Sequence, residues 1–294
     1  MSYHSGTITN PTTPAGDLVA AIEAVLAVTA GWTFVEVTSG ISVWRNDHAE
    51  GTFYAYLRGT EGATPNFHLG LSEGYNGVAK TAIRPAPHYN QTQAVAADDS
   101  LGNGTEYTLL NGTTTGYQWI NLSNATFDYW FVVTEHSLIV WARIGAATSG
   151  AALQRFESLL VTDPGRFVLF NPTSSATTST GIGNTASTRH PQRGGQVANG
   201  ANFKFYGPAS ATIWWTKVSG MVAGTGDLFH GGGPIGTRIT VWGIGGASAY
   251  GAVRGLFRDL LAFSTDSAVA PGDLLTVNGQ QYVCVTSSGV WVKA

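Results

Sequence analysis

Cysteine and charge are both scarce in this sequence, and each scarcity excludes a class of protein. Cys284 is the one cysteine among 294 residues, so neither an intramolecular disulfide nor a cysteine-based metal cluster can form. Its context, Tyr-Val-Cys-Val, is typical of an inert strand residue. Charged residues make up 11% of the chain and the formal net charge is -3. Without a basic patch, the chain is not expected to bind nucleic acid or an anionic membrane.

Long apolar runs are missing as well. No uninterrupted stretch reaches the roughly 18 residues of a membrane-spanning helix. The first residues, Met-Ser-Tyr-His-Ser-Gly, lack the basic and apolar parts of a secretory signal, so none is predicted. The chain is instead rich in glycine, with 38 residues, and it contains 9 tryptophans. This composition is typical of a folded, turn-rich β protein and not of a disordered one.

The densest run of aromatic and β-branched residues spans 127–144 and predicts a hairpin. Its arms, 127–134 and 138–144, flank the polar break Glu135-His136-Ser137, whose length suits a tight antiparallel connection. Both arms are almost continuously apolar, so we expect them in the middle of a sheet that is covered on both faces. Aromatic strand residues of this kind serve packing far more often than chemistry.

One helix and many short strands are predicted around this hairpin. An amphipathic helix over 16–28 places Leu18, Ile22 and Leu26 on one face, with Asp17 in its first turn. Period-two patterns predict strands at 32–37, 41–45, 53–58, 107–110, 117–122, 203–206, 211–218, 237–243 and 255–263. The pair Asn278-Gly279 lies between two alternating runs and predicts a type I′ hairpin over 272–285. We expect 67–93 to be a loop, and 154–161 to be either a strand or a short helix.

These patterns predict a mainly β protein of the α+β class, with antiparallel, sandwich-like sheets and one N-terminal amphipathic helix packed on a sheet. Residues 1–170 would form the helix and a first β domain, and 202–294 a C-terminal β lobe that is either separate or packed with the first as one domain. Residues 171–201 are dominated by Ser, Thr, Gly, Asn and Pro. They would be a linker or an extended arm that orders on a neighbouring subunit.

Two fragments together imitate a lipase. Gly70-Leu-Ser-Glu-Gly74 fits the nucleophile elbow around Ser72, and His230-Gly-Gly-Gly233 fits an oxyanion loop. In that fold the oxyanion loop precedes the nucleophile, whereas here it follows, and Ser72 is not followed by a helical pattern. The alternation of strands and helices that such a fold needs is missing too. We therefore interpret Ser72 as a loop serine.

Other clusters of reactive residue types also lack the spacing of a site. Asp47, His48 and Glu50 stand together in a predicted turn, where Asp and His are common for conformational reasons. The other histidines show no ligand spacing, and the glycines of 243–251 do not match a dinucleotide fingerprint. The sequence therefore predicts no catalytic, metal-binding or cofactor-binding residues and no enzyme activity.

A family resemblance appears at the central hairpin. Asp128-Tyr-Trp-Phe131, a polar break, Leu138-Ile-Val-Trp-Ala-Arg143 and a later Phe156-Glu-Ser158 resemble a family of tailed-bacteriophage virion proteins, in which the same succession of strands recurs. The opening helix with the strand at 32–37 and the closing hairpin at 272–285 are also similar to that family. The chain departs from it at Glu135-His136, where an Asn-Gly-type turn is usual, and throughout 171–201.

The resemblance implies a tail, baseplate or collar subunit without catalytic residues, made in the host cytoplasm and built into the virion. Its partners would be copies of itself and other virion proteins, and neither nucleic acid nor a membrane is expected as a partner. Low charge and an extended arm suit a self-assembling subunit as well. A carbohydrate-binding adhesin or receptor-binding tip is the alternative, with exposed aromatics such as Tyr117 and Trp119 stacking on host-surface sugars. A hydrolase of cell-envelope polymer that uses Ser72 is a third hypothesis.

Overall fold

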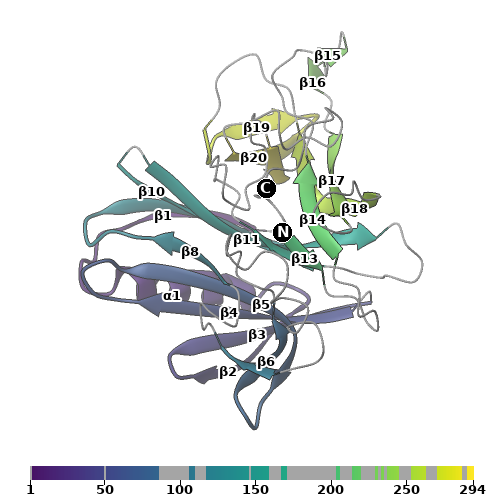
Figure 1. Ribbon diagram of the computed structural model, residues 1–294. Helices are drawn as coiled ribbons and strands as arrows, with labels where there is room; N and C mark the ends of the chain where they lie inside the picture. Colours follow the sequence, from purple (N-terminus) through teal and green to yellow (C-terminus); the bar gives the residue numbers. More distant parts are fainter. Residues whose placement is uncertain are drawn as a thin grey trace.

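The computed structural model describes residues 2–49, 51–85, 106–109, 117–145, 147–158, 167–170, 203–205, 214–219, 229–230, 233–234, 237–244, 253–262, 270–286 and 290–294. Within these ranges the chain forms antiparallel strands and one α-helix near the N-terminus (Figure 1). This confirms the predicted fold class, a mainly β protein with antiparallel sheets and a single N-terminal helix.

The smaller of the two main sheets is formed by the N-terminal part of the chain. It contains β2 (Trp32–Thr38), β3 (Ile41–His48), β4 (Gly51–Thr60), β5 (Asn66–Asn76), β6 (Thr81–Pro85) and β7 (Glu106–Thr108) in sequence order, and β8 (Tyr117–Asn121) beside β5. The first part of β5 pairs with β8, whereas its second part pairs with β6. Because β5 changes partner along its length, β6 and β7 pack over the outer face of the sheet. They enclose a second small core there, made of Ile41, Val43, Tyr56, Ala82 and Leu109.

Strands β5 and β6 show that the prediction of a loop over 67–93 was wrong for the described residues 67–85. Phe67, Leu69 and Leu71 alternate along β5 and are buried, which is the period of a strand with one face on a core. The small residues Gly70 and Ser72 occupy the positions that alternate with them, and the Ser72 hydroxyl contacts the hydroxyl of the buried Tyr56. Gly and Ser have low strand propensity, so a strand that carries them beside a large residue of the neighbouring strand has the sequence pattern of a loop.

The larger sheet joins strands from both ends of the chain. Its main path runs β1 (Ser2–Ile8), β9 (Phe127–Val133), β10 (Ser137–Ile144), β11 (Ala147–Ser158), β18 (Val253–Ala262), β17 (Thr237–Ile244), β14 (Trp214–Ser219) and β13 (Phe203–Phe205). Off this path lie β12 (Phe167–Phe170), β19 (Leu274–Val277), β20 (Gln280–Thr286) and β21 (Val290–Lys293). The short strands β15 (Phe229–His230) and β16 (Gly233–Pro234) pair separately. The strand β1 had no counterpart among the predicted elements.

Both predicted hairpins are confirmed. In the central one, β9 and β10 pair antiparallel with Trp130 opposite Trp141, and the turn lies at 134–136, one residue before the predicted break at 135–137. In the C-terminal one, Asn278 and Gly279 connect β19 and β20 with φ values of 51° and 76°, the positive values that a type I′ turn requires. The stretch 154–158, left open between strand and helix, belongs to strand β11.

The principal core lies between the two sheets and is closed by the helix. The helix α1 (Pro14–Leu26) buries Leu18, Ile22 and Leu26 there, and Figure 1 shows it alongside β4. The alternate residues Phe131 and Val133 of β9 point into the same core. Val132 and Trp141, which alternate with the core-facing residues, are also fully buried, so both faces of the hairpin are covered as its continuous apolar pattern predicts.

The helix lies unusually close to β4. A Cβ atom at Gly59 would be only 2.7 Å from the carbonyl carbon of Ala15, so a side chain there has no room. Glu61 is the first residue after β4, and its carboxylate accepts hydrogen bonds from the backbone N–H groups of Gly16 (2.7 Å) and Ala15 (3.4 Å). This carboxylate satisfies donors of the first helical turn and opposes the positive end of the helix dipole.

Strands from before and after 171–201 share the larger sheet, since Phe156 of β11 pairs with Phe257 of β18. The C-terminal strands also pack on the outer face of the central hairpin, where Gly272 lies directly against the indole ring of Trp130. The segment 171–201 itself lies outside the described residues, and its role as linker or arm stays a prediction. So does the division of the chain into two lobes.

Candidate functional site

The structure separates the two fragments that imitate a lipase. Ser72 lies within strand β5 and not at a turn between a strand and a helix. Its buried hydroxyl contacts the Tyr56 hydroxyl and donates a hydrogen bond to the carbonyl oxygen of Gly74 at 2.7 Å. Burial raises the pKa of Tyr56, so its hydroxyl stays protonated. His230 belongs to β15, in the separate two-stranded sheet.

The residues Asp47, His48 and Glu50, which stand together in the sequence, do not form a described site either. Asp47 and His48 belong to strand β3 and not to the turn that was predicted there, so their side chains point to opposite faces. Asp47 accepts hydrogen bonds from Arg45 Nε at 2.7 Å and from Thr52 Oγ1 at 2.8 Å. Glu50 lies outside the described residues. Across the part of the chain that the structure describes, no group of three His, Cys, Asp or Glu side chains could hold a metal ion.

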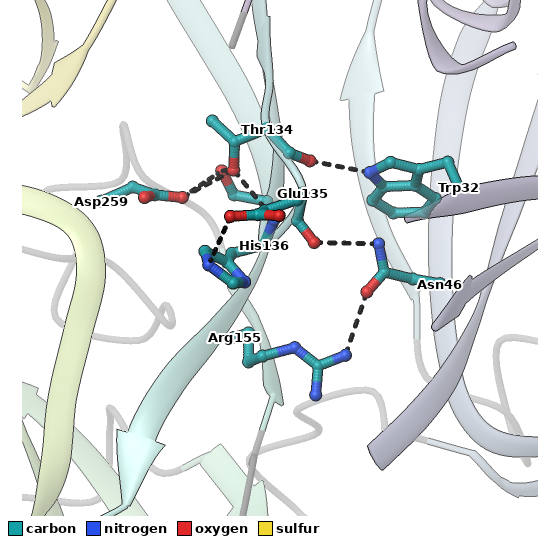
Figure 2. A network of polar contacts seen from close by, with 8 residues as sticks. Trp32, Asn46, Thr134, Glu135, His136, Arg155 and Asp259 are labelled. Carbon is teal, nitrogen blue, oxygen red and sulfur yellow. Dashed lines mark hydrogen bonds and ion pairs between the residues drawn. The ribbon is translucent and has the colours of Figure 1, made fainter. Parts of the chain in front are cut away.

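A polar cluster that the sequence did not indicate surrounds the turn of the central hairpin, and we call it the turn junction. Figure 2 shows the turn in the centre, with the N-terminal sheet on one side and strand β18 on the other. Its members come from β2, β3, the turn with the start of β10, β11 and β18: Trp32, Asn46, His48, Thr134, Glu135, His136, Ser137, Arg155 and Asp259. Three parts of the chain therefore meet at one tight turn.

The N-terminal sheet binds the backbone of the turn. Trp32 Nε1 donates a hydrogen bond of 2.7 Å to the carbonyl oxygen of Thr134, and Asn46 Nδ2 donates one of 3.1 Å to that of Glu135. Both carbonyl groups would otherwise face away from the strand ladder, and backbone oxygens that leave water need such partners. These two bonds position the turn relative to β2 and β3.

Arg155 orients Asn46 from below. Its side chain is fully buried, and its Nη2 donates hydrogen bonds of 3.0 Å to Asn46 Oδ1 and of 3.0 Å to the carbonyl oxygen of Gly51. The guanidinium group also lies over the ring of Phe53 at 5.1 Å. Because Oδ1 accepts from Arg155, the amide nitrogen of Asn46 is directed to the turn. The backbone N–H of Arg155 in addition donates to the carbonyl oxygen of His136 at 2.8 Å.

Strand β18 binds the turn through the carboxylate of Asp259. Thr134 Oγ1 and Ser137 Oγ donate hydrogen bonds to Asp259 Oδ2 at 2.7 and 3.0 Å. The same Thr134 oxygen accepts a hydrogen bond of 3.0 Å from the backbone N–H of His136. Hydrogen bonds to an ionised carboxylate are about twice as strong as neutral ones. The carboxylate of Asp259 thus accepts hydrogen bonds from two hydroxyl groups of the turn.

His136 is a further buried titratable group of the turn junction. Its Nε2 atom lies 3.3 Å from Glu135 Oε1, and its ring meets that of His48 edge to face with centroids 4.8 Å apart. Its Nδ1 atom is buried and has no hydrogen-bond partner among the described residues. Burial lowers the pKa of His136; Asp259 and Glu135 oppose this shift, and the positive charge of Arg258 adds to it. The imidazole is therefore neutral near pH 7.

Serine, histidine and aspartate occur together here, but their connections differ from those of a nucleophilic triad. Ser137 donates to Asp259, and His136 contacts Glu135, so the imidazole does not lie between the hydroxyl and the carboxylate. What the arrangement does is to connect three chain segments. Sequence reasoning interpreted 135–137 as a polar break only, because its partners lie about 90 to 125 positions away along the chain.

The second candidate feature is the free edge of strand β2. In the described part of the chain β2 pairs with β3 alone. Six large apolar side chains are exposed in the described part of the chain, and three of them lie on β2: Phe34 (49% exposed), Val35 (38%) and Val37 (60%). Its charged residue, Glu36, accepts a hydrogen bond of 2.9 Å from the Tyr75 hydroxyl and forms an ion pair with Lys80. The β2 edge is thus apolar and electrically neutralised.

The edge strand β1 of the larger sheet is different in character. It carries Ser2, His4, Ser5 and Thr7, and none of the exposed large apolar residues lies on it. Polar edge strands resist pairing with other chains, whereas apolar ones favour it. The β2 edge therefore differs in character from the β1 edge.

No protein-family model and no curated protein matches this chain. No helix in the described ranges is long and apolar enough to cross a membrane. The turn junction, the β2 edge and the sequence resemblance are therefore the features that bear on function.

Proposed function

We propose that the chain is a non-enzymatic structural subunit of a tailed-bacteriophage particle, as a tail, baseplate or collar protein that assembles with copies of itself and with other virion proteins. The observation that carries the assembly part is the β2 edge: β2 pairs only with β3 in the described part of the chain and has three exposed apolar side chains. The phage part comes from the sequence resemblance at 128–131, 138–143 and 272–285. It implies synthesis in the host cytoplasm and a final place in the virion.

A second copy of the chain is the occupant that best fits the β2 edge. An antiparallel strand pair is self-complementary under a two-fold rotation, so the free N–H and C=O groups of one β2 can pair with those of another. The neutralisation of Glu36 by Lys80 removes the charge that would keep two such edges apart. The exposed Phe34, Val35 and Val37 would then leave water, which favours association by about 25 cal/mol per Å² of apolar area. A strand pair alone is small, so further contacts would complete the assembly.

The test is the oligomeric state, measured by size exclusion with light scattering and by negative-stain imaging. We expect the wild-type chain to form a discrete closed oligomer or a regular tube. Val37→Lys introduces a charge on the β2 edge, and we expect it to shift the population to monomers.

The matched control is Val78→Lys, which makes the same change at a 95% exposed valine in the turn between β5 and β6. It should assemble like the wild type, and circular dichroism should show that both variants are folded. If the two variants behave alike, or if the wild type is a monomer at every concentration, the β2 edge does not drive assembly.

The carbohydrate-binding alternative requires exposed aromatic side chains with polar groups between them. Tyr54 and Tyr75 approach this description, because they are partly exposed, with ring centroids 6.1 Å apart, close to Glu36 and Lys80. Both also pack against the small outer core. A glycan array on the purified chain distinguishes the two functions, since selective binding of one sugar class by a monomer would favour a receptor-binding tip.

A further inference from the structure

The backbone groups of β2 that point away from β3 follow from the pairing of the two strands. In an antiparallel pair, successive residues direct their N–H and C=O groups alternately toward the partner strand and away from it. The two strands are joined by the two-residue turn Ser39-Gly40, with φ values of 50° and 72°, so Thr38 and Ile41 form the hydrogen-bonded pair that closes the turn. Thr38 therefore faces β3, and Val37 faces away from it.

At the other end of β2 the same alternation starts from Gly31, whose carbonyl oxygen accepts a hydrogen bond of 2.8 Å from the backbone N–H of Asp47. Trp32 and Phe34 therefore face away from β3. The N–H of Trp32 is already used, because it donates to the carbonyl oxygen of Thr29 at 3.3 Å. The groups of Phe34 and, further along, Val37 point to the edge, and no strand in the described part of the chain pairs with them there.

A β-bulge lets both of these residues face the edge although they are three positions apart. Phe34 is opposite Trp44 and Glu36 is opposite Val43, so Val35 is an extra residue of β2 without an opposite residue on β3. In a regular strand, residues three positions apart point in opposite directions. The extra residue removes this difference.

The same bulge puts the side chains of Phe34 and Val37 on one face of the sheet. Phe34 packs edge to face on the ring of Trp44, with centroids 5.4 Å apart. Val37 is opposite Ser42, and the Trp44 Nε1 atom donates a hydrogen bond of 3.0 Å to the Ser42 hydroxyl on that face. Both apolar side chains are about half exposed, so this face of the edge offers an apolar pair to a partner.

Building on the proposed assembly through the β2 edge, we infer that two copies pair β2 against β2 in one register, with Phe34 of each copy opposite Val37 of the other and the two-fold axis at the bulge. The edge groups of these residues then form two hydrogen-bonded pairs, one on each side of the axis. A bulge usually interrupts pairing along an edge. Here the two bulges lie opposite each other, so both strands carry the extra residue at the same point.

This register also gives Lys80 a role in assembly. It brings the Glu36 side chains of the two copies close together beside the axis, on the face that carries the small outer core. Each carboxylate is held by the ion pair with Lys80 and by the Tyr75 hydroxyl at 2.9 Å. Like charges at neighbouring positions of paired strands oppose the pairing. Lys80 therefore permits the close approach of the two copies by compensating Glu36.

Disulfide cross-linking of the full-length chain under oxidising conditions tests the register. The Cα atoms of a hydrogen-bonded pair are about 5.5 Å apart, which suits a disulfide. We expect an equimolar mixture of Phe34→Cys and Val37→Cys chains to give a disulfide-linked dimer on a non-reducing gel, and neither variant to do so alone. The wild type, whose Cys284 is buried, is the blank, and Val28→Cys, at an 81% exposed valine outside β2, measures chance collisions.

A dimer from Phe34→Cys alone or from Val37→Cys alone, above the level of Val28→Cys, would place the axis at that residue and overturn the register. So would a mixture that does not cross-link although the wild type is an oligomer. A wild type that is monomeric at every concentration would contradict the proposed assembly itself, and the register with it.

The charge compensation is tested by the dissociation constant at low ionic strength. Lys80→Ala should raise it about tenfold, and adding Glu36→Gln to this variant should bring it back towards the wild-type value, because no charge is then left beside the axis. Unchanged association of Lys80→Ala would show that the two carboxylates do not meet at the axis and would overturn the inference.

Discussion

Gly272→Ala is the sharpest test of how the C-terminal strands are held on the central hairpin. Gly272 adopts a φ of +94°, and a Cβ atom there would overlap the indole ring of Trp130. Even the third-nearest ring atom, Cζ2, would be 2.5 Å away, where carbon atoms normally keep about 3.5–4.0 Å. Trp130 is only 7% exposed, and the Arg143 guanidinium lies 5.1 Å from its ring, so the indole has little freedom to move aside.

Two costs add up at this position. Left-handed backbone costs an alanine about 1–2 kcal/mol, and forcing an extra methyl group into a packed site costs about 1–3 kcal/mol. Gly279→Ala is the matched control, because Gly279 has a φ of +76° in the neighbouring turn and nothing lies within 4 Å of its Cβ position. The control bears the backbone cost alone. We therefore expect Gly272→Ala to reduce the free energy of unfolding by about 1–3 kcal/mol more than Gly279→Ala does.

Urea unfolding followed by tryptophan fluorescence measures both variants against the wild type. The effect of each substitution on the entropy of the unfolded chain is the same and cancels in the comparison. Equal destabilisation by the two variants would show that Gly272 does not pack on Trp130. The C-terminal strands would then not lie on the hairpin as described.

Two further predictions concern the N-terminal part of the chain. Gly59→Ala should destabilise the protein by about 1–3 kcal/mol in urea unfolding, because a Cβ atom there would lie 2.7 Å from the helix backbone. Gly77→Ala is the control and should not destabilise it in this way, because the nearest atom to its Cβ would be 3.8 Å away. Equal effects of the two substitutions would contradict the close packing of the helix on β4. Burial lowers the pKa of His68 to about 4, and Arg58 acts in the same direction. Since this is below the value of about 6.5 in the unfolded chain, stability is lost as the pH falls from 6.5 towards 4. Between pH 7 and 5 the wild type should lose about 1 kcal/mol more than His68→Gln, after allowance for partial exposure, and equal losses would refute this.

Local patterns predicted those elements whose residues carry their own signal. The apolar arms around Glu135-His136-Ser137 indicated the central hairpin, and Asn278-Gly279 indicated the C-terminal one, because a type I′ turn selects those residues through backbone conformation. Strand β5 was missed, although Phe67, Leu69 and Leu71 alternate along it, because the positions between them hold Gly70 and Ser72, residue types that are common in loops. Their small size makes sense only beside Tyr56, a neighbour on another strand.

The sequence by itself determined the fold class, the helix face and both hairpins, since each depends on the conformational preference and periodicity of adjacent residues. It contained no local indication of the turn junction, whose members Trp32, Asn46, Thr134 and Asp259 lie far apart along the chain. It also could not indicate that β2 is an edge strand, because an apolar strand reads alike in the middle of a sheet and at its border. Only the tertiary structure decided these two features, because burial and strand neighbours depend on how the whole chain packs and not on any short stretch of it.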